Sequence, residues 1–170
     1  MYQGLILFYV GAVLILNGLH MLNQISDREI PTINIFVGLL SFLVALKLAL
    51  GADANFYSIR ISAFSLLFAF TYLWVAFNWV SRSDGRGLGW FSLFVSLSAT
   101  AIGAEGLYAA ESAWSYWIAL SWLAWAGLWI IFFAILVCRK DWKRQAGYIA
   151  VTQGILTGWL PGYFLLTGRI

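Results

Sequence analysis

The sequence predicts an all-α integral membrane protein built as a bundle of six transmembrane helices. Hydrophobic residues make up 62% of the chain and charged residues only 10%, whereas a soluble domain carries about 25% charged residues. Six apolar stretches follow one another, separated by short polar connections. Because a membrane-spanning helix needs about 20 apolar residues, each stretch is long enough to span, and residues 1–170 are expected to form a single transmembrane domain.

The first three spans are expected near residues 2–22, 32–50 and 57–79. The span near 2–22 has no basic start and runs for about 20 residues, which is spanning length rather than signal-peptide length. The polar stretches NQISDREIP and GADAN separate the three spans. Both connections are too short to form a separate domain.

The last three spans are expected near residues 88–110, 114–138 and 146–167. The polar stretches SRSDGRG, AAES and RKDWKRQ precede them in turn. In the final span glycine recurs at every fourth residue from Gly154 to Gly162, so these glycines share one helix face. Small residues let helix backbones approach closely. This face therefore predicts tight helix packing or, alternatively, a narrow space beside a pore.

Lys and Arg divide unequally between the two ends of the expected bundle. The first, third and fifth connections hold Arg28, Arg82, Arg86, Arg139, Lys140, Lys143 and Arg144. The opposite end holds Lys47, Arg60 and Arg169. Cytoplasmic ends are enriched in Lys and Arg, so we expect a multi-pass protein of the bacterial inner membrane with both termini outside. The basic residues fall in connections, which gives no support for a nucleic-acid partner.

The chain has few groups that could carry out chemistry. No Asp or Glu lies deep inside an expected span, and His20 is the sole histidine. A metal site or a Ser/His/Asp arrangement cannot be assembled persuasively from this inventory, so we expect no enzyme activity, metal or cofactor. Coupled transporters usually need an ionisable residue within the membrane, which disfavours coupling. The lone Cys138 has no disulfide partner in the chain and is expected to be a packing residue.

Three tryptophans lie near the middle of the fifth span, in the stretch WLAWAGLW. At 100° per residue, Trp122, Trp125 and Trp129 share one helix face. Each indole N–H is a donor that lipid cannot satisfy. A row of indoles at this depth suits a small polar solute better than a lipid-facing wall, although an aromatic core stripe without a transport role is the alternative.

The third span offers a second aromatic face in LFAFTYLWVAFN, where Phe70, Trp74 and Phe77 lie at i, i+4 and i+7. Two opposed aromatic faces would leave a slot for a flat, uncharged molecule. Asn17 and Gln153 are uncharged amides that either exchange hydrogen bonds with such a molecule or bond a neighbouring helix. A neutral lining does not repay the dehydration of an ion, so urea and small amides are the expected permeants.

The chain resembles the UreI/AmiS family of urea and short-chain amide channels. The matching stretches are LFYVGAVLILNGL, NIFVGLLSF, LFAFTYLWVAFN, WFSLFVSL, WLAWAGLW and QGILTGWLPGYFLL. The resemblance implies a homo-hexameric ring in which each protomer has its own pore and lipid fills the centre. It also implies constrictions on the third and fifth helices. By motif these are Phe70, Trp74, Trp125 and Trp129, with Trp122 as a further match.

Two departures from acid-gated relatives bear on gating. Those relatives read EGILT in the last helix, with a pore-lining glutamate, and Gln153 at that position cannot titrate. They also carry a long external loop rich in histidine, a residue suited to sensing acid, whereas the second connection here is only GADANFYS. The sequence therefore predicts a passive channel without acid gating that feeds a cytoplasmic urease or amidase. A coupled secondary transporter of acetamide or a similar amide, and a membrane interaction protein without transport, are the alternatives.

Overall fold

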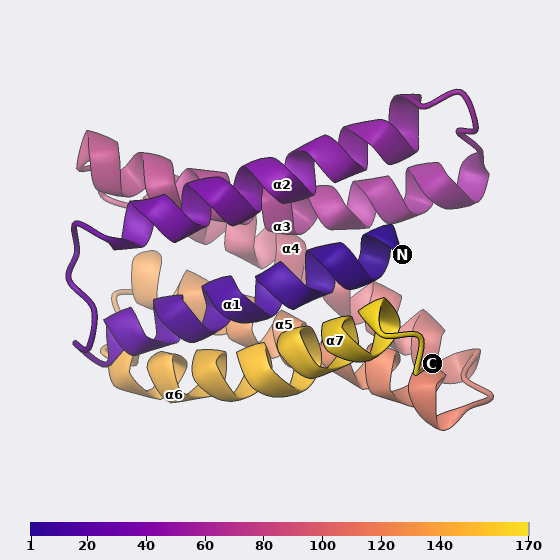
Figure 1. The fold of residues 1–170 in the computed structure, drawn as a ribbon. Coiled ribbons are helices and arrows are strands. Elements are labelled where there is room, and N and C mark those ends of the chain that lie inside the picture. The colour runs from indigo at the N-terminus through magenta and orange to yellow at the C-terminus, as the bar shows by residue number, and fades with distance from the viewer. Residues whose placement is uncertain (170) are drawn as a thin grey trace.

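The computed structural model describes residues 1–169, which form a bundle of helices with both termini at the same end (Figure 1). The elements are α1 (Tyr2–Met21), α2 (Ile30–Leu50), α3 (Phe56–Ser81), α4 (Arg86–Tyr108), α5 (Ala113–Leu136), α6 (Lys143–Gln153), the π-helical turn η1 (Gly154–Trp159) and α7 (Leu160–Leu166). Within the described residues, six helical spans are long and apolar enough to cross a membrane, and the sixth joins α6, η1 and α7. The predicted all-α membrane fold with six spans is confirmed.

Local sequence signals explain where α3 and α5 begin. The Asn55 side chain accepts hydrogen bonds from the first turn of α3, and Ser58 returns a bond to the Asn55 backbone. Ser112 and Ser115 form the same reciprocal arrangement at the start of α5. Such capping boxes satisfy N–H groups that a helix start leaves unpaired. The two connections that follow α2 and α4 are therefore short turns held by their own hydrogen bonds.

The helices pack largely as antiparallel neighbours, with α2 against α3, α4 against α5, and α1 against the last span (Figure 1). Glycines permit the contact between α1 and the last span. A Cβ atom built on Gly158 would lie 2.5 Å from the Gly11 Cα atom, which is closer than van der Waals contact allows. Here the repeated glycines of the last span serve close helix packing.

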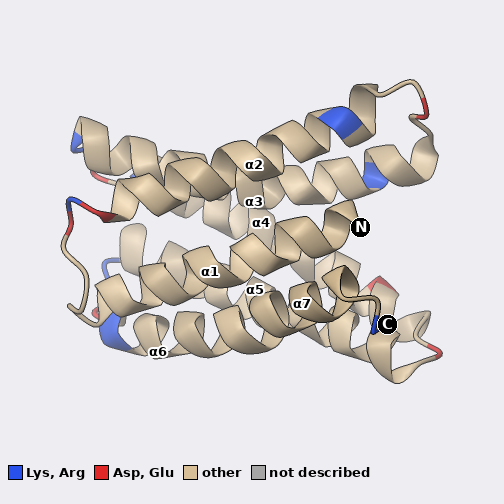
Figure 2. Cartoon of the chain, in the orientation of Figure 1, with Lys and Arg blue, Asp and Glu red and all other residues tan. Residues whose placement is uncertain are grey.

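Charged residues gather towards the two ends of the bundle, and its middle is free of them (Figure 2). We call the end with the first, third and fifth connections the basic end, because seven of the ten Lys and Arg residues belong to it. The opposite end, which holds both chain ends, is called the termini end (Figure 1). The bundle interior must therefore act through apolar and neutral polar side chains.

Candidate permeation pathway

Three cavities follow one another along α1. The termini-end cavity, of about 90 Å³, is bordered by α1 residues between Gln3 and Val10. The central cavity, of about 50 Å³, is bordered by Leu14 and Asn17. The basic-end cavity, of about 420 Å³, is bordered by Asn17 and by residues up to Met21. Because the 20 residues of α1 extend for about 30 Å, the row of cavities is as long as the hydrocarbon core is thick.

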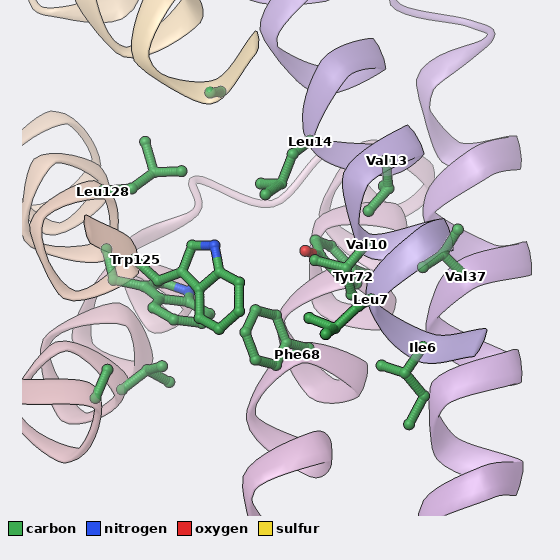
Figure 3. Packing of buried hydrophobic residues seen from close by; sticks show 14 of the residues in the cluster. Ile6, Leu7, Val10, Val13, Leu14, Val37, Phe68, Tyr72, Trp125 and Leu128 are labelled. Carbon is green, nitrogen blue, oxygen red and sulfur yellow. The ribbon is translucent and has the colours of Figure 1, made fainter. Parts of the chain in front are cut away.

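Two aromatic rings separate the termini-end cavity from the central cavity. Phe68 of α3 and Trp125 of α5 line both cavities. Their ring centroids lie 4.9 Å apart with an interplanar angle of 85°, an edge-to-face contact of the kind that aromatic pairs favour. Figure 3 shows the Trp125 and Phe68 side chains next to each other within the cluster of buried hydrophobic residues. We call this pair the septum.

Other rings of α5 extend the septum on both sides. The ring centroid of Trp122 lies 5.7 Å from that of Phe68, and Trp122 lines the termini-end cavity. The ring centroid of Trp129 lies 5.0 Å from that of Phe68, and Trp129 lines the central cavity. Tyr72 of α3 also lines the central cavity. The three tryptophans that the sequence places on one face of the fifth span are thus gathered around one phenyl ring.

The central cavity meets the basic-end cavity at Asn17, which lines both. The Asn17 amide nitrogen donates to Asn34 Oδ1 at 3.1 Å, and the Asn34 amide nitrogen donates back to Asn17 Oδ1 at 2.7 Å. Asn34 is buried and also donates to the Ile30 carbonyl. The reciprocal amide pair therefore ties α1 to α2 and fixes a polar group at the junction of two cavities.

The indole N–H groups of the three tryptophans differ in their partners. Trp125 Nε1 donates to Thr157 Oγ1 at 2.8 Å, so this donor is already satisfied by the protein. Within residues 1–169, the N–H groups of Trp122 and Trp129 have no protein partner, and neither nitrogen is among the fully buried polar atoms. The same holds for the Tyr72 hydroxyl. Trp122, with its unpaired N–H, thus lines the termini-end cavity, and Trp129 and Tyr72 line the central cavity.

The structure does not bring Phe70 and Trp74 to the tryptophans, contrary to the expectation for the third span. Phe70 is 42% exposed and lies against Phe42, and Trp74 is 37% exposed and lies against Phe91. Successive helical residues are rotated by 100°, so residues two positions apart point in nearly opposite directions. The ring that faces the pathway from α3 is therefore Phe68, which is 5% exposed.

Gln153 also lies elsewhere than expected. Its amide nitrogen donates to the Ala124 carbonyl of α5 at 2.9 Å, and it lines none of the three cavities. Its side-chain oxygen is buried without a partner among the described residues. A buried amide within the membrane satisfies its donor on the nearest carbonyl, so Gln153 ties two helices together rather than lining the pathway.

Among the described residues, acidic and basic side chains along the pathway occur only at the basic end. In the part of the chain that the structure describes, no Asp, Glu, Lys or Arg lines the termini-end or central cavity, whereas Arg82, Asp84 and Lys143 line the basic-end cavity. His20 is buried in the wall of that cavity, with Nε2 2.8 Å from Asp27 Oδ1. The narrow part of the pathway thus offers only neutral groups.

Comparisons with known proteins assign the chain to a family. The sequence profile of the AmiS/UreI family of transporters matches residues 2–169. A protein of Mycolicibacterium smegmatis that is named for the transport of amidate substrates is 40% identical over 167 residues, which cover 98% of this chain and 77% of that protein. The acid-activated urea channel of Helicobacter pylori is 31% identical over 193 aligned positions, covering 95% of this chain and 96% of that protein.

Solved structures agree with the sequence relatives. The cryo-electron microscopy structure of the Helicobacter pylori urea channel in a closed state matches with a TM-score of 0.84 and 32% identity, over 99% of both chains. The crystal structure of that urea channel matches with the same TM-score and 31% identity. The family resemblance predicted from the sequence motifs is confirmed. On fold, sequence and extent of match, this chain belongs to the AmiS/UreI family of transporters.

Proposed function

We propose that the chain is a passive channel for urea and small neutral amides, selecting them at an aromatic slot. The observation that carries the proposal is the row of three cavities along α1, interrupted by the septum of Phe68 and Trp125. A row of cavities within one protomer suits a permeation pathway better than a protein whose aromatic residues serve only packing. Two rings in edge-to-face contact leave a narrow passage when they separate, and a flat molecule fits such a passage edge-on.

The neutral lining explains the proposed preference for uncharged solutes. A solute that enters the termini-end cavity meets the free N–H of Trp122. Beyond the septum it meets the Trp129 N–H and the Tyr72 hydroxyl, and then the amide of Asn17. These groups replace part of the hydration of an amide. They cannot replace the hydration of an ion, which costs far more to remove.

Stopped-flow light scattering on proteoliposomes tests the proposal. Urea, formamide and acetamide are expected to equilibrate faster than in protein-free liposomes, while N-methylurea and sodium ions are not. Equal rates with and without protein for all three solutes would overturn the proposed function. The relative rates identify the preferred solute, and the amidate-transporter relative makes acetamide as important to test as urea.

The response of uptake to solute concentration and to a protonophore distinguishes a passive channel from a coupled transporter. Among the described residues, no Asp, Glu, His, Lys or Arg lines the termini-end or central cavity, and coupled transporters usually need such a residue within the membrane. Uptake of labelled acetamide is therefore expected to rise linearly with concentration and to be insensitive to a protonophore. Saturable uptake that collapses when the protonophore is added would establish coupling instead.

Six protomers are proposed to form a ring with lipid at its centre, as the family resemblance implies. Large apolar side chains cover the outside of the bundle, among them Phe36 of α2, Phe77 of α3 and Phe94 of α4. Such surfaces must meet either lipid or a neighbouring protomer. Native mass spectrometry of the detergent-extracted protein should give the mass of a hexamer, and a monomer mass under mild conditions would contradict the ring.

The proposed location is the inner membrane, with the termini end outside and the basic end in the cytoplasm. The excess of Lys and Arg at the basic end supports this orientation. Solute leaving the basic-end cavity would then reach a cytoplasmic urease or amidase. A protease-sensitive tag at the C-terminus should be cleaved from outside intact spheroplasts, and protection of the tag would reverse the orientation.

A further inference from the structure

The last span contains a backbone irregularity beside the septum. Residues Gly154–Trp159 form a π-helical turn, in which N–H groups bond carbonyls five residues back, as Leu160 does with Ile155. Continued by one residue, this register would pair the Leu156 carbonyl with the N–H of residue 161. That residue is Pro161, which has no N–H. The π-helical register therefore leaves the Leu156 carbonyl to be satisfied from outside its own helix.

Two tryptophans of α5 bond to this turn. Trp117 Nε1 donates to the Leu156 carbonyl at 2.9 Å, and Trp125 Nε1 donates to Thr157 Oγ1 at 2.8 Å. Trp117 packs against Phe164 and lines none of the three cavities. Trp125 is half of the septum. The bond to Thr157 is therefore the one that acts on the pathway.

The Thr157 hydroxyl has a fixed orientation. It donates to the Gln153 carbonyl at 2.6 Å, so its hydrogen is directed along its own helix and an oxygen lone pair faces the Trp125 indole. The outer torsion of a tryptophan side chain is intrinsically broad, so the hydrogen bond adds to packing in fixing the plane of the buried Trp125 ring. In that plane the Trp125 ring stands at 85° to the Phe68 ring.

We propose that Thr157 is a positioning residue for the septum: by holding Trp125 edge-on to Phe68, it sets the width of the gap that distinguishes urea from larger amides. The inference rests on the proposed channel function. Thr157 is buried behind the indole and lines none of the cavities. It acts through Trp125, whose N–H is occupied by this bond. The N–H groups of Trp122 and Trp129 are the donors left for the permeant.

Three threonine variants test the proposal in proteoliposomes, with the ratio of urea to N-methylurea permeability as the readout. Thr157→Val keeps the side-chain shape and removes the hydroxyl, and should lower the ratio about three- to tenfold, the range typical for losing one buried hydrogen bond. Thr157→Ser keeps the hydroxyl and should retain the ratio. Thr100→Val is the matched control, because the Thr100 hydroxyl makes the same bond four residues back, to Ser96, and meets no indole.

Trp125→Phe provides the second variant, since it removes the N–H and leaves Thr157 in place. In the Trp125→Phe background, Thr157→Val should change the ratio no further, because the two residues act through one bond. The nitrogen-15 NMR signal of the Trp125 indole should also shift in Thr157→Val and stay in place in Thr100→Val.

The outcomes separate this inference from the proposed function. Rapid urea flux with an unchanged ratio in Thr157→Val would overturn the positioning role and leave the channel proposal intact. A further loss of ratio in the Trp125→Phe background would also overturn it. Absence of flux above protein-free liposomes in the unmodified protein would overturn the channel function, and the selectivity role of Thr157 with it.

Discussion

The two aromatic faces of α3 point in opposite directions. Phe68 and Tyr72 face inward and border the central cavity, whereas Phe70 and Trp74 lie on the outside of the bundle. Both pairs are aromatic and both are spaced at i and i+4. In water the more apolar face of a helix turns inward, but lipid is as apolar as these side chains and gives no such preference. An aromatic face on a transmembrane helix is therefore not by itself evidence of a pore.

Removing one ring from each face of α3, in separate variants, should give the largest difference in solute selectivity. Phe68→Ala removes half of the septum and joins two cavities, so the ratio of urea to N-methylurea permeability should fall roughly tenfold or more, as happens when a size-selective site loses a wall. Trp125→Ala should act in the same way. Phe70→Ala, two residues from Phe68, should leave the ratio unchanged in stopped-flow measurements. Equal losses in Phe68→Ala and Phe70→Ala would show that the inward face has been misassigned.

Two tryptophans, one that lines the pathway and one that lies outside it, extend the comparison to single N–H donors. Trp129 lines the central cavity and its N–H has no partner among the described residues. In Trp129→Phe, urea permeability should fall about three- to tenfold if the proposed hydrogen bond to the permeant is lost. Trp74→Phe removes the N–H of a residue that lines none of the three cavities, and should have no effect on permeability. A matching decrease in Trp74→Phe would indicate that the loss reflects folding rather than permeation.

Loss of the Tyr72 hydroxyl should reduce urea permeability less than loss of the Trp129 N–H. Tyr72→Phe is expected to lower urea permeability only about twofold, a small share of a hydrogen bond, because Trp129 and Asn17 still offer polar groups in the same cavity. Tyr57→Phe, on the exposed start of α3, is the control, and both variants are measured in the same liposome preparation. A tenfold decrease in Tyr72→Phe would make this hydroxyl the main contact of the permeant.

The smallest expected effect is that of external pH. The inward face of α3 carries no carboxylate or histidine, and the connection between α2 and α3 is a short capped turn with no histidine. Urea flux into proteoliposomes should therefore change less than about twofold between external pH of about 5 and about 7.5, since histidine is the side chain that titrates in that range. A several-fold rise at the lower pH would contradict a channel without acid gating.

The spans were predictable from sequence because the membrane imposes a length. Each run of about 20 apolar residues forms one span, and polar connections mark the ends. The start of α6 at Lys143 lies earlier than the expected residue 146, because charged residues belong to the first turn of the helix. The π-helical turn could not be predicted, since a change of hydrogen-bond register leaves no change in hydrophobicity.

The α5 part of the site was also predictable, and the α3 part was not. Trp122, Trp125 and Trp129 fall on one face because helical geometry fixes their spacing. On α3, periodicity finds two aromatic faces and cannot rank them. The polar residues of α3 do not help either: Thr71 and Asn78 are seven residues apart and share a face, and both line cavities. At 100° per residue, this polar face lies between the two aromatic faces, so it does not tell which of them turns inward.

The glycine contacts between α1 and the last span have a kinetic consequence. Because Gly11 and Gly158 leave no space between two backbones, sliding of these helices would require a collision of main chains. α3 and α5 meet at the septum through side chains, and Trp125 is held by Thr157. Phe68 is then the ring of the septum that no hydrogen bond holds. In the proposed channel, the septum would therefore open by turning of the Phe68 ring, without the collective helix motion that takes microseconds or longer.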